Sequence, residues 1–321
     1  MTENLNKIVR LIDENDDFIL ISHISPDGDT VGAAIGLAIT LRSLNKRARL
    51  ICQDKPPNVY SYLKLWDEYI DPSEASFSQV AIAIDCADEG RLGRSKAFFD
   101  GAKEKAAIDH HITHMPFADI TVLDSNASST GEIVLKIIEQ LSETVDCEAA
   151  TALYTAIVTD TGGFAYSNTT PASHIAAAKL LSFGVDSAKV DRLVYKTMPL
   201  PKTKLTGFAM MNTELYDDGK IGLAVVMQRD MLRFSARAED SEGIIERVRD
   251  IEGVEIAMFL RECLDGEFKV SLRSKEHSDV GKLAQDFGGG GHKFAAGFKI
   301  GMTLEDLIPS VLKAARTSLR R

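Results

Sequence analysis

Eight acidic and imidazole side chains stand at four places along the chain, each at the end of an apolar run or a helical pattern. They are His23, Asp27, Asp29, Asp85, Asp109, His110, His111 and Asp160. Carboxylate oxygens mixed with imidazole nitrogens suit Mn²⁺ or a similar divalent ion better than Ca²⁺ or a zinc site of thiolates. Five or six such ligands exceed what one ion takes when it also keeps open positions. We therefore expect two divalent ions, ~3.5–4 Å apart and sharing a carboxylate, that activate water and stabilise charge on an attacked phosphorus.

Each motif has a structural alternative when it is taken alone. Asp27-Gly28-Asp29 could be a turn followed by a helix N-cap, His23 could be an ordinary loop or core histidine, and Asp85 could cap the next segment. Asp109-His110-His111 is more specific, because two adjacent histidines after an acid at a strand end are uncommon in a structural role. The occurrence of all four motifs in this order favours the metal site.

The elements that must position these side chains follow from the hydrophobic pattern. Short apolar runs alternate with helical patterns in the first half, which predicts an α/β fold with a mostly parallel sheet covered by helices. The expected strands are 18–22, 49–52, 80–85 and 106–109, and the expected helices are 29–44, 130–141, 148–159 and 171–183. The carboxyl ends of such strands share one edge of the sheet, where ligands bind in open α/β folds.

A second, smaller α/β domain is expected in the rest of the chain. Met198-Pro199-Leu200-Pro201 breaks the helical pattern between two amphipathic segments. We place the metal-binding domain at 1–186, a helical linker at 187–218 and the second domain at 219–321. Its expected strands are 221–227, 254–260 and 268–272, and its expected helices are 241–248, 280–286 and 304–318.

The four motifs resemble the signature motifs of the DHH phosphoesterase superfamily. They read HISPDGD (23–29), IDCAD (84–88), DHH (109–111) and TDTGGF (159–164). The run FGGGGH (287–292) resembles the glycine-rich motif of the DHHA1 domain. The resemblance covers essentially the whole chain. It is nearest to the NrnA-type family of bifunctional oligoribonucleases and adenosine 3′,5′-bisphosphate (pAp) phosphatases.

This resemblance implies a role for each residue. It assigns His23 and Asp27 to one metal, Asp29, His110 and Asp160 to the other, and Asp85 to both. It also places Asp85, Asp109 and His111 in the catalytic machinery. His111 would lie beside the bound phosphate as a hydrogen-bond donor or acid to the leaving oxygen, and Asp109 would orient a neighbouring imidazole. Mn²⁺ is the expected ion, with Mg²⁺ or Co²⁺ as alternatives.

The glycine run is the expected phosphate-binding segment of the second domain. Gly289, Gly290 and Gly291 let backbone N–H groups approach an anion. The run is no dinucleotide fingerprint, because it follows a helical pattern and lacks the GxGxxG spacing. A flexible turn is the alternative for the glycines alone. Together with His292 and Arg273, however, they favour a clamp for a substrate phosphate. Asn168, after the TDTGGF motif, fits an ordinary turn.

The composition of the whole chain limits which substrates and which cellular locations we expect. The net charge of −10 disfavours tight binding of long or duplex nucleic acid, which needs a broad basic surface. No apolar run approaches the ~20 residues that span a bilayer, and the charged residues 1–15 do not fit a signal peptide. We expect a cytoplasmic protein without a membrane partner. The four cysteines are widely spaced, which argues against a disulfide framework or a zinc knuckle.

The expected protein is a hydrolase that degrades short oligoribonucleotides to mononucleotides, adenosine 3′,5′-bisphosphate to AMP, or both. Alternatives are a phosphodiesterase of cyclic or linear di-AMP and a manganese inorganic pyrophosphatase. The pyrophosphatase would need a denser Arg/Lys cluster than Arg273 and Lys275. A non-catalytic nucleotide sensor is disfavoured by the intact ligand set. The sequence leaves open the preferred substrate, the direction of exonucleolytic attack and a homodimer.

Overall fold

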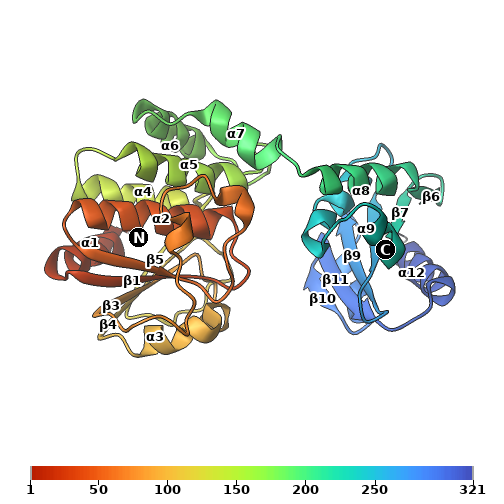
Figure 1. Cartoon of the computed structure of the whole chain (residues 1–321), viewed down its shortest axis with the longest axis horizontal. Coiled ribbons are helices and arrows are strands. Elements are labelled where there is room, and N and C mark those ends of the chain that lie inside the picture. The colour runs from red at the N-terminus through yellow and green to blue at the C-terminus, as the bar shows by residue number, and fades with distance from the viewer. Residues whose placement is uncertain (1, 320–321) are drawn as a thin grey trace. The chain divides into compact units, whose positions relative to one another are not determined.

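The chain folds into two units, Met1–Thr197 and Met198–Arg321, in a computed structural model that describes residues 2–319 (Figure 1). Helix α7 (Ser187–Tyr195) packs on the first unit, where the Tyr195 hydroxyl donates a hydrogen bond to the carbonyl of Val158. Helix α8 (Leu200–Met211) instead buries Leu205 and Ala209 in a core of the second unit. The segment 187–218, expected to be a linker, is therefore divided between the units, because each of its helices has an apolar face with a partner.

The first unit has a five-stranded sheet in the order β2-β1-β3-β4-β5, and every neighbouring pair is parallel. Its strands are β1 (Asp17–Ser22), β2 (Arg47–Ile51), β3 (Val80–Ile84), β4 (Glu104–Asp109) and β5 (Ile120–Leu123). The expected α/β fold with a parallel sheet is confirmed. Strand β5 was not expected; it has four residues, of which only Val122 is buried, so its apolar signal is short.

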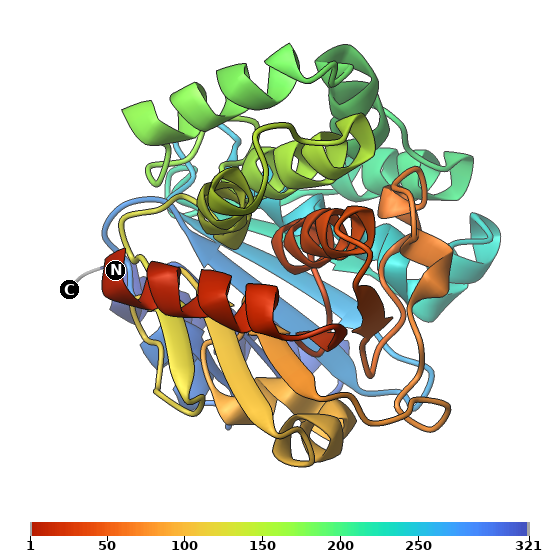
Figure 2. The same ribbon diagram turned by 90° about the vertical axis from the view of Figure 1, so that its left-hand side faces the viewer.

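Helices cover both faces of this sheet, which explains the continuous apolar runs of its strands. On one face lie α1 (Thr2–Glu14), α2 (Gly28–Ser43), α4 (Thr130–Leu141) and α5 (Cys147–Asp160), packed on Phe18 and Leu20. Figure 2 shows α1 running across this face. The 3₁₀ helix η3 (Glu89–Ser95) and α3 (Lys96–Asp100) cover the other face, where Phe99 packs with Ile19 and Ile21. Helix α6 (Pro171–Ser182) packs against α5.

The second unit has a mixed six-stranded sheet in the order β10-β11-β9-β8-β7-β6, in which only β7 and β8 pair in parallel. Its strands are β6 (Glu214–Tyr216), β7 (Ile221–Val226), β8 (Ile256–Glu262), β9 (Phe268–Ser274), β10 (Gly290–His292) and β11 (Ala295–Ile300). Helices α11 (Val280–Gln285) and α12 (Leu304–Leu319) pack on one face. Helices α8, α9 (Gln228–Arg233) and α10 (Ile244–Arg249) pack on the other. The smaller α/β domain is confirmed.

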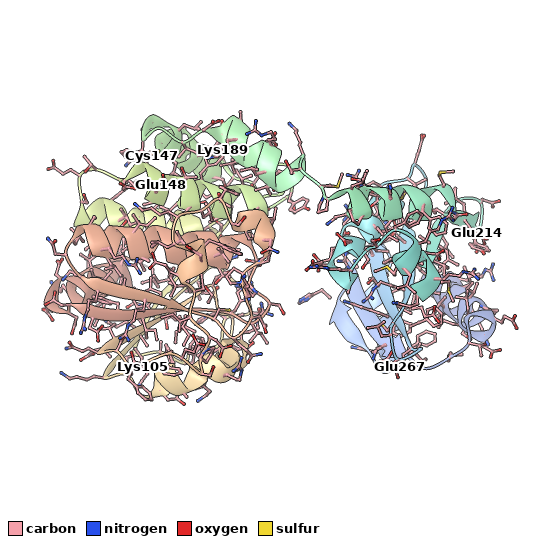
Figure 3. The ribbon with its side chains drawn as sticks, viewed as in Figure 1. Lys105, Cys147, Glu148, Lys189, Glu214 and Glu267 are labelled. Atoms are coloured by element: carbon pink, nitrogen blue, oxygen red, sulfur yellow. The ribbon has the colours of Figure 1, made fainter. Side chains whose placement is uncertain are left out.

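Two further expectations concern the chain as a whole. Within residues 2–319, none of the helices is both long enough and apolar enough to cross a membrane. Cys52, Cys86, Cys147 and Cys263 are all free thiols, as their spacing predicts. Cys147, at the start of α5, is exposed (Figure 3).

The carboxylate of Glu255 organises the loop that follows β9. It accepts hydrogen bonds from the backbone N–H groups of His277 and Ser278, each at 2.8 Å, and from that of Glu276 at 3.2 Å. Burial alone would raise the pKa of this carboxyl group, but the three donors hold it below its ordinary value of 4.5. The stability that Glu255 contributes is therefore present above pH 4.5 and is lost as the pH falls through the lower pKa of the folded state.

We expect Glu255→Gln to lower the free energy of unfolding by about 1–3 kcal/mol at pH 7, because one charged acceptor of three hydrogen bonds is lost. The difference from the wild type should vanish in acid, where Glu255 itself is protonated. Urea unfolding between pH 3 and pH 8 measures this difference. Glu252→Gln, at an exposed acid three residues before Glu255, is the control. A difference that does not change with pH would contradict the role of the charge.

Candidate metal centre

The expected metal ligands come together at the carboxyl ends of β1, β3 and β4. Three groups of side chains each have ligand atoms within 4.8 Å of one another. They are His23 with Asp27 and Asp85, Asp29 with His110 and Asp160, and Asp85 with His110 and His111. All six residues expected to bind metal are therefore in one place. The assignment of each to a particular ion stays a prediction.

Asp85 belongs to the first group, and its two carboxylate oxygens face one histidine of each of the first two groups. Its Oδ2 is 3.6 Å from Nε2 of His23, and its Oδ1 is 3.7 Å from Nε2 of His110. The backbone of Asp85 has a φ of 60°, in the left-handed region that few residues other than glycine adopt. Such a conformation persists only where the surroundings enforce it. The sharp turn after β3 thus directs a buried carboxylate between two sets of ligands.

The spacing of the side chains fits divalent cations. Nε2 of His110 lies 3.6 Å from Oδ2 of Asp160 and 3.7 Å from Oδ2 of Asp29. These distances are too long for hydrogen bonds. Ligands about 2.1 Å from a shared ion are about 3–3.5 Å apart when they are neighbours around it. The distances between these carboxylate oxygens and imidazole nitrogens are slightly longer than that spacing. The side chains could therefore hold a divalent metal.

The electrostatics of the cluster also favour a cation. Burial, followed by repulsion from Asp85, raises the pKa of Asp29 well above its ordinary value. Burial raises the pKa of Asp160 to about 6, against the attraction of His110. Burial lowers the pKa of His23, but the neighbouring carboxylates of Asp27 and Asp85 raise it to about 9. The buried carboxylates thus repel one another and attract protons, and a divalent cation would balance this negative charge.

The amino end of α4 positions two of the carboxylates. Asp29 accepts hydrogen bonds from the backbone N–H of Thr130 at 2.6 Å and of Gly131 at 2.9 Å. The Thr130 hydroxyl donates to Oδ1 of Asp85 at 2.8 Å. Ser129 caps the helix by accepting from the N–H of Glu132. The first turn of α4 thus connects Asp29 to Asp85.

Local hydrogen bonds orient the other ligands. Asp27 is the N-cap of α2, as the structural alternative for its motif predicted. Its Oδ1 is also 3.7 Å from Nε2 of His23. Nδ1 of His23 lies 2.8 Å from the carbonyl oxygen of Ile24 and 2.9 Å from Nη2 of Arg91, and neither contact involves Nε2, which faces the cluster. The amide of Asn168 donates to the backbone carbonyl of Asp160 at 3.0 Å and to its Oδ2 at 3.3 Å. Asn168 therefore supports the site, which its turn-like sequence did not indicate.

Asp109 is fully buried and holds two imidazoles. Its Oδ1 is 2.7 Å from Nδ1 of His111, and its Oδ2 is 2.6 Å from Nδ1 of His114. Both rings must carry the proton on Nδ1 to donate these bonds, which leaves Nε2 of His111 for other contacts. The hydrogen bond to Asp109 raises the pKa of the partly exposed His111. His114 was not expected from the sequence, because no motif marks a histidine three residues after DHH.

The residues expected to bind a substrate phosphate lie on one face of the second sheet. His292 pairs with Ala295, and Ala295 pairs with Arg273, so the three side chains form a row across β10, β11 and β9. The guanidinium of Arg273 also pairs with Glu246, with Nη2 and Oε1 3.0 Å apart. His292 and Arg273 therefore flank a small residue, and their role as a phosphate clamp stays a prediction.

The glycines of the run differ in the space that surrounds them. A Cβ atom on Gly289 would lie 2.3 Å from the carbonyl oxygen of Gly297, and one on Gly291 would lie 2.5 Å from that of Ala295. The packing of β10 on β11 therefore requires both glycines. A Cβ atom on Gly290 would meet nothing within 4 Å. The fold thus leaves only Gly290 of the three free for the approach of a ligand.

Comparisons with known proteins decide the family. Residues 17–157 match the DHH family, N-terminal domain, and residues 219–321 match the DHHA1 domain. The bifunctional oligoribonuclease and PAP phosphatase NrnA of Thermus thermophilus is 33% identical over 306 residues, which are 94% of this chain and 90% of that protein. The chain belongs to the DHH family. The protein of the same name from Bacillus subtilis is 30% identical over 298 residues, 92% of each chain.

Solved structures agree with this membership. An exopolyphosphatase-related protein of Bacteroides fragilis has a TM-score of 0.91 and 27% identity, covering 99% of this DHH chain and 96% of its own. The exonuclease RecJ bound to manganese has a TM-score of 0.55 at 14% identity, covering 99% of this chain and 94% of its own, and shares the fold. The DHH protein is a hydrolase acting on phosphate ester bonds, and its acidic and histidine side chains could bind metal.

Proposed function

We propose that this DHH phosphoesterase hydrolyses short oligoribonucleotides to mononucleotides and adenosine 3′,5′-bisphosphate to AMP, with two divalent metal ions. The observation that carries the proposal is the position of Asp85, whose two carboxylate oxygens lie toward two separate groups of ligands. The names of the relatives from Thermus thermophilus and Bacillus subtilis support the substrate class. A cytoplasmic location follows as part of the proposal, because such nucleotides are made there.

In this proposal each residue of the centre has one task. His23 and Asp27 hold one ion, Asp29, His110 and Asp160 hold the other, and Asp85 is shared. When bound, the ions supply Lewis-acid stabilisation and lower the pKa of water. Mn²⁺ suits this mixed set of oxygen and nitrogen ligands, and Mg²⁺ and Co²⁺ are alternatives.

His111 is the proposed acid in the reaction. Asp109 accepts the hydrogen bond from Nδ1 of His111, and the doubly protonated ring can then give the proton on Nε2 to the departing nucleotide oxygen. The same hydrogen bond raises the pKa of His111, which keeps that proton on the ring at a higher pH. A departing ribose hydroxyl is a poor leaving group without a proton, so this donation contributes to the rate.

Arg273, His292 and the backbone around Gly290 are the proposed contacts to a substrate phosphate. We expect Gly290→Ala to leave the free energy of unfolding unchanged and to raise KM, because its Cβ atom would occupy the open side of β10. Gly289→Ala, the matched variant, should lower that free energy by about 1–3 kcal/mol or more through overpacking against β11. Thermal unfolding and steady-state kinetics measure the two effects. An unchanged KM in Gly290→Ala would argue against this contact.

A substrate panel tests the proposed function. The protein is stripped of metal with a chelator and then supplied with Mn²⁺, Mg²⁺ or Co²⁺ separately. The panel contains di- to pentaribonucleotides, a long single strand, adenosine 3′,5′-bisphosphate, cyclic di-AMP and pyrophosphate. We expect the highest kcat/KM for the short RNAs or adenosine 3′,5′-bisphosphate, and none without metal. Preference for pyrophosphate or cyclic di-AMP, or full activity after chelation, would overturn the proposal.

A further inference from the structure

Three basic side chains form a row across the second sheet, away from the Arg273 row. Lys269 on β9 pairs directly with Arg261 on β8 and with Lys299 on β11. Directly paired residues project from the same face of a sheet, so the three cations share one face. Like charges placed opposite each other destabilise a sheet unless a counter-ion lies nearby.

Only one of these cations has acidic partners. The ammonium group of Lys299 pairs with Asp265 and with Glu267, the latter at 2.6 Å (Glu267 is labelled in Figure 3). Within residues 2–319, the side chains of Arg261 and Lys269 have neither a hydrogen bond nor an ion pair. Two neighbouring cations thus lack counter-ions in a chain whose net charge is −10.

Arg261 and Lys269 line the same hollow as Arg273. The hollow has a volume of about 200 Å³ and lies between α10 and the strands β8 and β9. Its opposite wall carries Glu242 and Glu246, and Glu246 is already paired with Arg273. The cations of β8 and β9 therefore exceed the acids that are free to neutralise them.

The spacing along β9 separates this pair of cations from the expected phosphate clamp. Lys269 and Arg273 are four residues apart on the same face, which corresponds to ~13 Å along a strand. That distance is longer than a single phosphate group. A phosphate at Arg273 and His292 leaves the ammonium group of Lys269 available for another phosphate of the same chain. Ser271 lies between them on β9 and pairs with Gly297 on β11. Because both residues are small, no large side chain projects from the sheet between Lys269 and Arg273.

We propose that Arg261 and Lys269 form a second phosphate-binding subsite, which takes a backbone phosphate of an oligoribonucleotide farther from the cleaved bond. This inference rests on the proposed function, because it assumes an RNA substrate at Arg273. With this subsite, binding by the second unit would depend on the length of the RNA. A substrate with a single nucleoside would reach only the clamp, whereas a longer strand would reach both positions.

The test compares substrates of two lengths in matched variants of the full chain, supplied with Mn²⁺. Arg261→Gln and Lys269→Gln should each lower kcat/KM for pentaadenylate about 5- to 10-fold. They should leave kcat/KM for adenosine 3′,5′-bisphosphate unchanged. The slope of log kcat/KM for pentaadenylate against log salt should become shallower by about 0.7 for each cation removed. Lys299→Gln, in the same row but paired with two acids, is the control and should have little effect on either substrate.

Three outcomes would overturn the inference. Equal losses of kcat/KM for both substrates would show that the cations act in catalysis or folding rather than in the recognition of RNA length. Unchanged kinetics for both would remove the subsite while the proposed function stands. A wild-type protein that cleaves no oligoribonucleotide would refute the proposed function first, and the subsite with it. Circular dichroism of all three variants confirms that the fold is retained.

Discussion

Asp85→Asn should abolish the hydrolysis of short RNA and of adenosine 3′,5′-bisphosphate together, by roughly 10³-fold or more. The substitution removes the charge that faces both groups of ligands, and metal catalysis contributes several kcal/mol at about 1.4 kcal/mol for each tenfold in rate. It also removes the acceptor for the Thr130 hydroxyl if the amide nitrogen takes the place of Oδ1. Steady-state kinetics on both substrates, with a titration of bound Mn²⁺, measures the effect.

The control for this variant is Asp119→Asn, at an exposed acid in the same unit whose side chain makes no contact with the centre. It should keep the wild-type activity and the wild-type metal affinity. Asp85→Ala should behave like Asp85→Asn. A fully active Asp85→Asn or Asp85→Ala protein would show that the carboxylate is not shared between two ions, and would remove the basis of the proposed function.

His111→Gln should lower kcat for short RNA by roughly 10²–10⁴-fold, the usual contribution of a positioned acid. The loss should be much smaller for a 4-nitrophenyl ester of a nucleotide, because 4-nitrophenolate departs without a proton. The ratio of the two losses therefore separates proton donation from binding. His277→Gln, at an exposed histidine of the second unit, is the control. Equal losses on both substrates would contradict the role of His111 as an acid and leave it a contact to the phosphate.

Three of the ligand residues could be predicted from the sequence because each follows an apolar run that forms a strand of the sheet. His23 follows β1, Asp85 follows β3, and His110 follows β4, so the parallel order of these strands places the three side chains at one edge. The hydrophobic pattern thus contains the information that brings them together. Strand β5 was missed because only Val122 in it is buried, and four residues give little alternation.

The residues that support the ligands could not be predicted in the same way. Thr130 contacts Asp85 across 45 positions of sequence, and Asn168 contacts Asp160 from a loop whose composition is that of any turn. His114 is buried against Asp109, but no periodicity marks it. Arg261 and Lys269 face each other only through the register of β8 on β9. Such contacts depend on tertiary packing, so the second unit has more basic residues around Arg273 than the sequence indicated.

The close packing of α2 on α5 makes the centre sensitive to changes far from it in the chain. A Cβ atom on Gly32 would lie 2.3 Å from the carbonyl oxygen of Ala152, so the two helices touch backbone to backbone. Asp29 lies in the first turn of α2, and Asp160 ends α5. A single methyl group inserted at Gly32 would wedge the helices apart and widen the gap between these two carboxylates. The cation affinity of the proposed centre would therefore depend on the spacing of these two helices, and a variant with every proposed ligand intact would lose that affinity.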